Sequence, residues 1–142
     1  MKKILTIVII LLAYTVNAQE WQTDFATAQK IANEKNHKIV LVFSGSDWCA
    51  PCIKLESEIL ESTEFKTFAK DNFVLLKADF PRRKKNKLAK EQQEKNSKLA
   101  EKYNPNGYFP LVVVLKSDGK VLGVTGYKKV SPNEYIKILT SF

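Results

Sequence analysis

Continuous apolar runs alternate with polar stretches along this chain. The runs cover residues 39–43, 73–79 and 111–115 and are rich in Val, Ile and Leu. This pattern is typical of strands that are covered on both faces. A predicted helix separates the first two runs, so we expect them to pair in parallel through a right-handed crossover. The turn at residues 117–120 predicts a hairpin from the third run into a further strand over residues 121–126.

The polar stretch before the first strand carries apolar residues at helical spacing. Phe25 and Ala28 fall on one face of this predicted helix. Thr23 or Asp24 can cap its start, and Trp21 can pack back onto it as a hydrophobic staple.

Three further helices complete the predicted domain. One begins near Cys49, with a break expected at residues 62–63, and a mostly polar helix covers residues 86–103. Ser131 caps the last helix, where Glu134 completes a capping box. The element order α-β-α-β-α-β-β-α predicts an α/β fold with a central mixed sheet and flanking helices.

The first 18 residues have the pattern of a secretory signal peptide. Two lysines follow Met1, residues 4–14 are almost entirely apolar, and small residues lead to Ala18. We predict cleavage after Ala18, which leaves residues 19–142 as one domain in the periplasm of a bacterium. The alternative is an uncleaved anchor, the one way in which this chain is expected to touch a membrane.

The chain is basic, with 23 Lys and Arg against 15 Asp and Glu. The net charge of +8 falls to +6 when Lys2 and Lys3 leave with the signal peptide. Much of the excess lies in Arg82 to Lys87, a run that can bind nucleic acid or anionic lipid. Export argues against a nucleic-acid partner, and the solvated start of a helix is the preferred interpretation of this run.

Cys49 and Cys52 are the two cysteines of the chain, and three interpretations compete. A structural staple across two intervening residues would remove little entropy from the unfolded chain. A structural zinc site needs about four ligands, and His37 and scattered carboxylates are the other candidates. We therefore expect no metal and no other cofactor.

The third interpretation is a reactive pair. The turn after the first strand places Cys49 at a helix start, where free N–H groups favour an anion and lower the pKa of a thiol. Pro51 is tolerated in that first turn. Cys49 is then the nucleophile that attacks a substrate disulfide, and Cys52 resolves the mixed disulfide.

The motif Trp48-Cys49-Ala50-Pro51-Cys52 resembles the Trp-Cys-Gly-Pro-Cys of the thioredoxin superfamily. Residues 107–111 are similar to the cis-proline loop of that family, and the hairpin ending at Gly126 also falls where the fold expects it. The lead-in Gly-Ser-Asp-Trp-Cys is most similar to thioredoxin-like proteins exported by Bacteroidetes-type bacteria.

The resemblance implies a thioredoxin-like fold in which Pro110 is cis and lies against the cysteines. The backbone of Phe109 would then pair with an extended substrate peptide. Trp48 would flank the site as a docking surface, and core packing is its alternative role. The resemblance also places Ala50 and Pro51 in the substrate-binding set.

Two departures from the family pattern concern proton transfer. Thioredoxins carry a buried Asp before the motif and a buried Lys in the next strand, whereas counting places Phe43 and Leu75 there. A proton acceptor for Cys52 would then be water or a nearby acid. Glu56, one turn beyond Cys52, is the candidate, although at this spacing it can instead face solvent.

The direction of electron flow depends on the two residues between the cysteines. Ala50 and Pro51 offer no hydrogen-bond donor that would stabilise the reactive thiolate and so the reduced form of the protein. This predicts a reduction potential of about −200 to −270 mV, which favours a reductase. We therefore expect disulfide-containing proteins as substrates and an inner-membrane thiol reductase as electron donor. The rival hypothesis is a redox-inert adaptor that keeps the thioredoxin fold and a structural disulfide.

Overall fold

The apolar runs form the centre of one five-stranded sheet. The structure, a computed structural model, describes residues 20–142, so the predicted signal peptide lies outside the described residues. The strand order is β1-β3-β2-β4-β5. Both β1 and β2 run parallel to β3, while β4 is antiparallel to β2 and to β5. The strands are β1 (Trp21–Gln22), β2 (Lys38–Ser44), β3 (Phe73–Asp79), β4 (Leu111–Leu115) and β5 (Val121–Thr125).

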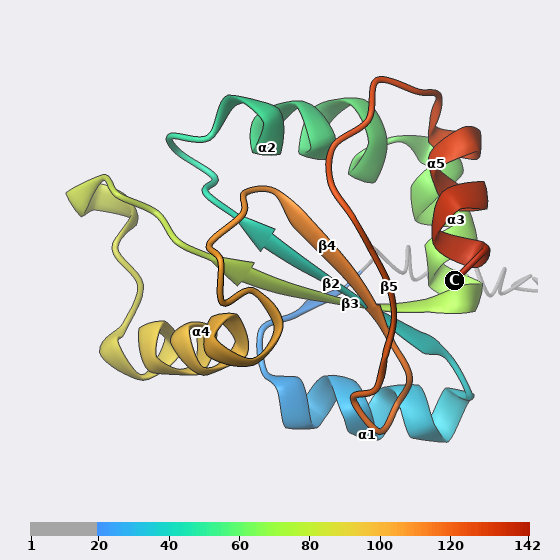
Figure 1. The fold of residues 1–142 in the computed structure, drawn as a ribbon, viewed down its shortest axis with the longest axis horizontal. Coiled ribbons are helices and arrows are strands. Elements are labelled where there is room, and N and C mark those ends of the chain that lie inside the picture. The colour runs from blue at the N-terminus through green and yellow to red at the C-terminus, as the bar shows by residue number, and fades with distance from the viewer. Residues whose placement is uncertain (1–19) are drawn as a thin grey trace, which may run out of the picture.

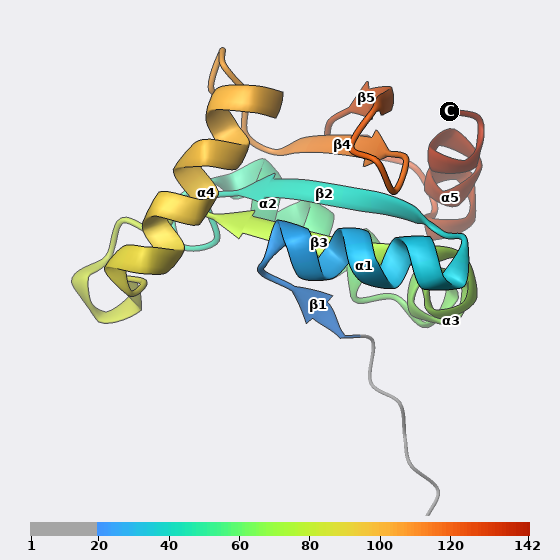
Figure 2. The same ribbon diagram turned by 90° about the horizontal axis from the view of Figure 1, so that it is seen from below.

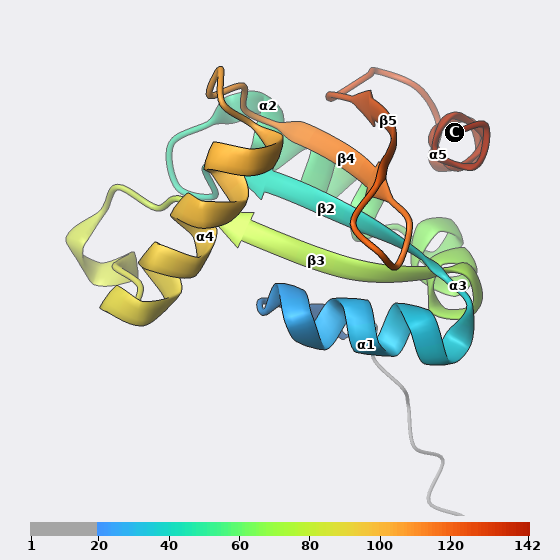
Figure 3. The same cartoon turned by 60° about the horizontal axis from the view of Figure 1, so that its bottom comes forward.

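Helices cover both faces of the sheet, as Figure 1 shows. On one face lie α2, the π-helix η1, α3 and α5, and on the other lie α1 and α4, which Figures 2 and 3 bring forward. Their bounds are α1 (Phe25–Lys35), α2 (Ala50–Lys54), η1 (Leu55–Leu60), α3 (Thr63–Asn72), the 3-10 turn η2 (Lys84–Asn86), α4 (Lys90–Tyr103) and α5 (Pro132–Thr140).

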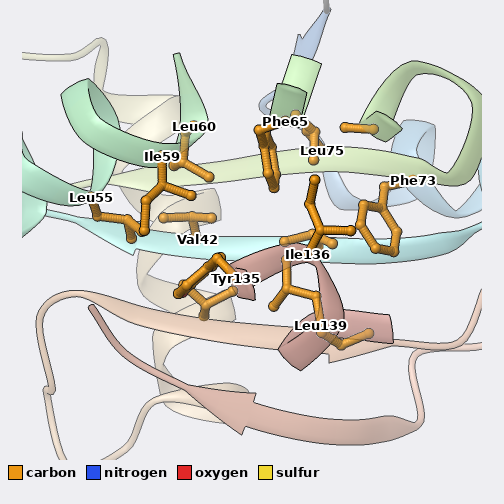
Figure 4. Close-up of a cluster of buried hydrophobic side chains, with 14 residues drawn as sticks. Val42, Leu55, Ile59, Leu60, Phe65, Phe73, Leu75, Tyr135, Ile136 and Leu139 are labelled. Carbon is orange, nitrogen blue, oxygen red and sulfur yellow. The ribbon is translucent and has the colours of Figure 1, made fainter. Parts of the chain in front are cut away.

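Alternation along β2 divides the core into two layers. Val40 and Val42 face the layer under α3 and α5, while Leu41 and Phe43 face the layer under α1 and α4. Figure 4 shows Val42 opposite side chains of η1 and α5 in the first layer. Because both faces of β2 are buried, its sequence is continuously apolar and forms the rigid base on which the following turn is built.

Most local predictions are confirmed, and one packing prediction is wrong. Asp24 caps α1 by accepting the Thr27 N–H at 2.9 Å, and Ser131 and Glu134 form the predicted capping box. Trp21 does not staple α1. It lies in β1, pairs with Leu75 at the sheet edge and packs in the layer of α3 and α5. A short strand at the edge takes the place of the staple because the edge of β3 offers it backbone hydrogen bonds.

The third predicted helix starts later than expected. It begins at Lys90, and residues 82–87 form an exposed loop with one 3-10 turn in front of it. The solvated helix start predicted for this basic run is therefore wrong. The cause lies in Asp47, whose carboxylate accepts the backbone N–H groups of Arg82 at 2.9 Å and Arg83 at 3.0 Å and so holds the run in a turn. Within residues 20–142, no helix is long and apolar enough to cross a membrane.

Candidate active site

The two cysteines lie at the carboxyl end of β2 and are bonded to each other. Cys49 is the N-cap of α2, and its sulfur accepts the Cys52 N–H at 3.3 Å. Gly45 donates its N–H to the Cys52 sulfur at 3.5 Å. Cys49 is 5% exposed and Cys52 is 3% exposed, while Ala50 and Pro51 between them are exposed. The predicted placement of the pair at the opening of a helix is thus observed, in its oxidised form.

The turn that carries Cys49 is held against the end of β3. Ser46 donates its backbone N–H at 3.0 Å and its hydroxyl at 2.6 Å to the carboxylate of Asp79. A Cβ at Gly45 would overlap the indole of Trp48, so the close approach of that ring requires glycine. These contacts fix the path of the chain between β2 and the first cysteine.

Trp48, next to the cysteine pair, has its indole ring packed against neighbouring groups. It is half-buried, and its indole N–H donates to the Phe80 carbonyl at 2.8 Å. Its ring meets the ring of Phe109 edge-on at 5.5 Å between centroids. The Arg82 guanidinium lies over the ring at 3.7 Å from a centroid. Of the two roles that the sequence left open for Trp48, these contacts show the packing role, and substrate docking stays a prediction.

The loop before β4 reaches the cysteine turn through Phe109. The Phe109–Pro110 peptide bond is cis, as the resemblance implied, and Pro110 is buried. Asn104, 4% exposed, braces this loop because its side chain donates to the Tyr108 carbonyl at 2.8 Å and accepts the Tyr108 N–H at 2.9 Å. Tyr108 itself is 61% exposed at the tip of the loop.

A charged pair lies behind Cys52. Lys77 on β3 donates to both carboxylate oxygens of Glu56, at 2.9 and 3.1 Å. A cleft of about 360 Å³ is lined by these two residues and Cys52, together with Ser44 and other polar side chains. Glu56 therefore turns towards the cleft and not simply to solvent, and its carboxylate shares a water-accessible space with the second cysteine.

Glu56 lies in the π-helix η1, four residues after Cys52. Glu61 donates its backbone N–H to the Glu56 carbonyl at 2.9 Å, a hydrogen bond five residues long that widens the helix by one residue. Phe43 and Leu75, which stand where the family pattern has its charged residues, are fully buried in the two core layers. A Glu–Lys pair on other positions thus occupies the space behind Cys52.

Asp47 ties the basic run to the cysteine turn. Besides the N–H groups of Arg82 and Arg83, its carboxylate accepts the side-chain amide of Asn86 at 3.0 Å. These hydrogen bonds, that from the Arg82 backbone first, hold the pKa of Asp47 at about 2. Sequence reasoning missed both this contact and the role of Lys77, because each joins residues that lie far apart in the chain and no local pattern marks them.

Comparisons with known proteins extend this description. The thioredoxin-like domain family matches residues 25–142 of the chain. The disulfide bond reductase DsbH of Chlamydia pneumoniae is 35% identical over 122 residues, which cover 86% of this chain and 71% of that protein. A solved structure of a DsbH oxidoreductase matches with a TM-score of 0.80 at 33% identity, covering 87% of this chain and 83% of the other. A thioredoxin from Thermus thermophilus, with a TM-score of 0.62 at 17% identity over 87% and 86% of the two chains, shares the fold.

Proposed function

This chain belongs to the thioredoxin-like family, and we propose that it is an exported reductase in which Cys49 and Cys52 reduce disulfides of other proteins. The family match and the DsbH relatives, together with the cysteine pair, make it a thiol–disulfide oxidoreductase. The observation that carries the proposed roles is the position of the pair, with Cys49 at the N-cap of α2 and Cys52 one turn behind it. Helix starts favour the thiolate, which is the reactive form of cysteine.

The proposed reaction has two exchange steps. In the reduced protein, the Cys49 thiolate attacks one sulfur of a substrate disulfide and releases the other sulfur as a thiolate. Cys52 then loses its proton and attacks the Cys49 sulfur, which frees the second substrate thiol. Two electrons pass to the substrate, and the protein is left with the Cys49–Cys52 disulfide seen in the structure.

Glu56 is the proposed proton acceptor for Cys52. Its carboxylate lines the same cleft as Cys52, and the cleft has room for bridging water. Lys77 holds that carboxylate by two hydrogen bonds, so its position behind the second cysteine is fixed. The pair would supply the acid–base function that the apolar side chains of Phe43 and Leu75 cannot supply.

The proposed substrate surface surrounds the motif. Ala50 and Pro51 are exposed between the cysteines, and the edge of Trp48 and the loop of Phe109 and Pro110 flank them. An extended segment of the substrate would pair with the backbone of Phe109, as in strand addition.

The proposed direction is reduction. The name of the Chlamydia relative, a disulfide bond reductase, and the absence of a polar side chain at Ala50 and Pro51 both favour it. The Dsb relatives suggest a partner in a disulfide pathway and protein substrates. In the periplasm, where the signal peptide would deliver the chain, an inner-membrane thiol reductase would return the electrons.

Insulin reduction tests the proposal. The protein without residues 1–18 should accelerate precipitation of the insulin B chain by dithiothreitol, and Cys49→Ser should abolish the acceleration. Cys52→Ala should accumulate mixed disulfides with its substrates, since the resolving thiol is missing. Absence of any acceleration by the wild-type protein, with partner binding unaffected by Cys49→Ser, would instead identify a redox-inert adaptor.

A further inference from the structure

A cluster of positive charge stands beside the cysteine pair. We call residues 82–87 the basic lobe; it holds five Lys or Arg and no acidic residue. All six residues are exposed. Since residues 19–142 carry a net charge of +6, five positive charges in six positions concentrate most of the excess at one place. In Figure 1 this loop projects beyond the carboxyl ends of β2 and β3, next to the turn that leads into α2.

The basic lobe is fixed to the cysteine turn. Asp47 accepts two backbone N–H groups and one side-chain amide from it, and the Arg82 guanidinium covers one face of Trp48. Trp48 immediately precedes Cys49 and its ring meets Phe109 of the proline loop. A substrate segment that reaches Cys49 therefore passes close to the basic lobe. The contacts with Asp47 and Trp48 hold the lobe in a fixed position relative to the Cys49 sulfur.

The charges of the basic lobe are open to a partner. Within residues 20–142, the ion pairs are Lys66–Glu61, Lys77–Glu56 and those of Lys95, so none uses a side chain of the lobe. The Asp47 carboxylate accepts backbone N–H groups of the lobe and the Asn86 amide. Arg82 packs on Trp48, and the other four cationic side chains of the lobe are exposed and form no ion pair within residues 20–142. Exposed charge of one sign on the rim of a binding site attracts a partner of the opposite sign and accelerates encounter.

We propose that the basic lobe selects protein substrates that carry acidic residues next to the disulfide they present to Cys49. This proposal rests on the reductase function proposed above and names its substrate class. An acidic polypeptide fits better than a membrane, because the large exposed apolar residues of the described chain (Ile53, Tyr108, Val121 and Val124) all lie outside the lobe. It fits better than a nucleic acid, because Arg82 already covers the Trp48 face on which a base would stack.

Two synthetic peptides test the proposal. Each contains one intramolecular disulfide, flanked by glutamates in the first peptide and by glutamines in the second. At an ionic strength of about 0.02 M, kcat/KM for the glutamate peptide should exceed that for the glutamine peptide about tenfold. At about 0.5 M the ratio should fall below about twofold, because salt screens exposed charges.

Two variants of equal net charge locate the effect. The lobe variant and the control variant each replace four cationic residues by glutamine. In the lobe variant, the ratio of kcat/KM for the glutamate peptide to that for the glutamine peptide should fall to about twofold or less at low salt, while in the control variant it stays about tenfold. The wild-type protein and both variants should reduce the glutamine peptide at the same rate. Arg82 is unchanged in both because it packs on Trp48. The lobe variant carries Arg83→Gln, Lys84→Gln, Lys85→Gln and Lys87→Gln. The control, on α1 and on the β4–β5 hairpin away from the cysteines, carries Lys30→Gln, Lys35→Gln, Lys116→Gln and Lys120→Gln.

A binding measurement separates this proposal from the reductase function. A linear glutamate peptide without cysteine should bind the oxidised protein, by fluorescence anisotropy, and lose affinity in the lobe variant alone. Such binding with no reduction of either peptide would support the lobe and overturn the reductase. Equal reduction of both peptides, without lobe-dependent binding, would overturn the lobe proposal and leave the reductase intact. Equal reduction combined with lobe-dependent binding to phosphatidylglycerol vesicles would also overturn it, in favour of a membrane surface.

Discussion

Replacing Glu56 by glutamine removes the proposed proton acceptor with little change of shape. The amide can still accept a hydrogen bond from Lys77, whose Nζ lies 2.9 and 3.1 Å from the two carboxylate oxygens. It cannot take up a proton from Cys52 across the cleft. The variant therefore isolates proton transfer from packing. The side chains of the ion pair are 24% and 34% exposed, so its loss should lower the free energy of unfolding by less than about 1 kcal/mol.

The size of the kinetic effect follows from thiol ionisation. An ordinary cysteine thiol, with a pKa of about 8.5, is roughly 3% thiolate at pH 7. A base that made the resolving thiol fully available could therefore accelerate its attack at most about 30-fold at that pH. Because the cleft lets a water molecule carry the proton in part, we expect a loss of about tenfold for Glu56→Gln. At higher pH thiols ionise without the help of a base, so the difference between wild-type protein and Glu56→Gln should shrink as the pH rises from about 7 to about 9.5.

Single-turnover quenching measures the step directly. Reduced protein is mixed with a disulfide peptide, stopped in acid and analysed by mass spectrometry for the mixed disulfide with Cys49. The lifetime of that species should lengthen about tenfold in Glu56→Gln at pH 7. Glu61→Gln is the matched control, since Glu61 lines the same cleft but pairs with Lys66 at 2.5 Å. Equal lifetimes for the two variants at pH 7, or a deficit of Glu56→Gln that is as large at pH 9.5 as at pH 7, would refute the role of Glu56.

Three further predictions concern the scaffold of the site. Tyr135→Phe should lower the free energy of unfolding in urea by about 1 kcal/mol, because the buried hydroxyl donates to the Gly126 carbonyl at 2.8 Å; an unchanged midpoint would contradict this. Gly45→Ala should displace the Trp48 indole and cost about 1–3 kcal/mol, measured by tryptophan fluorescence and thermal melting, and a native spectrum would be the contrary result. The pKa of Asp47, lowered to about 2, means that its contacts contribute fully above pH 4 and are lost as the pH falls through 2; amide NMR shifts of residues 82–87 with a midpoint near 4 would disprove it.

The central strands and the helix caps could be predicted because their causes are local. A strand buried on both faces has to be apolar throughout, and residues 39–43 and 111–115 were found as strands within a residue or two. The Ser131 cap depends on Glu134, three positions away, and is equally visible in the sequence. The fold class followed from the order of these elements and is confirmed by the family match and by the DsbH structure.

The short strand β1 and the π-helix η1 could not be predicted in the same way. The two residues of β1, Trp21–Gln22, carry no periodicity, and the strand exists because β3 offers an edge to pair with. The extra residue of η1 leaves the spacing of Leu55 and Ile59 compatible with an ordinary helix. Only the packed structure distinguishes these arrangements from the ones that local patterns favoured.

Two contacts of charged residues around the cysteine pair could not be predicted from local sequence patterns either, and both bear on function. Glu56 and Lys77 are 21 residues apart, and Asp47 and Arg82 are 35 apart. Both contacts form because β2 and β3 are parallel neighbours whose carboxyl ends share one edge. Asp47 and Arg82 follow the two strands at that edge, while Lys77, near the end of β3, reaches Glu56 on η1. The first contact holds a carboxylate beside the cleft of the second cysteine, and the other holds the basic lobe beside the first. Acid–base chemistry and substrate attraction can therefore be altered separately, as Glu56→Gln and the lobe variant would do.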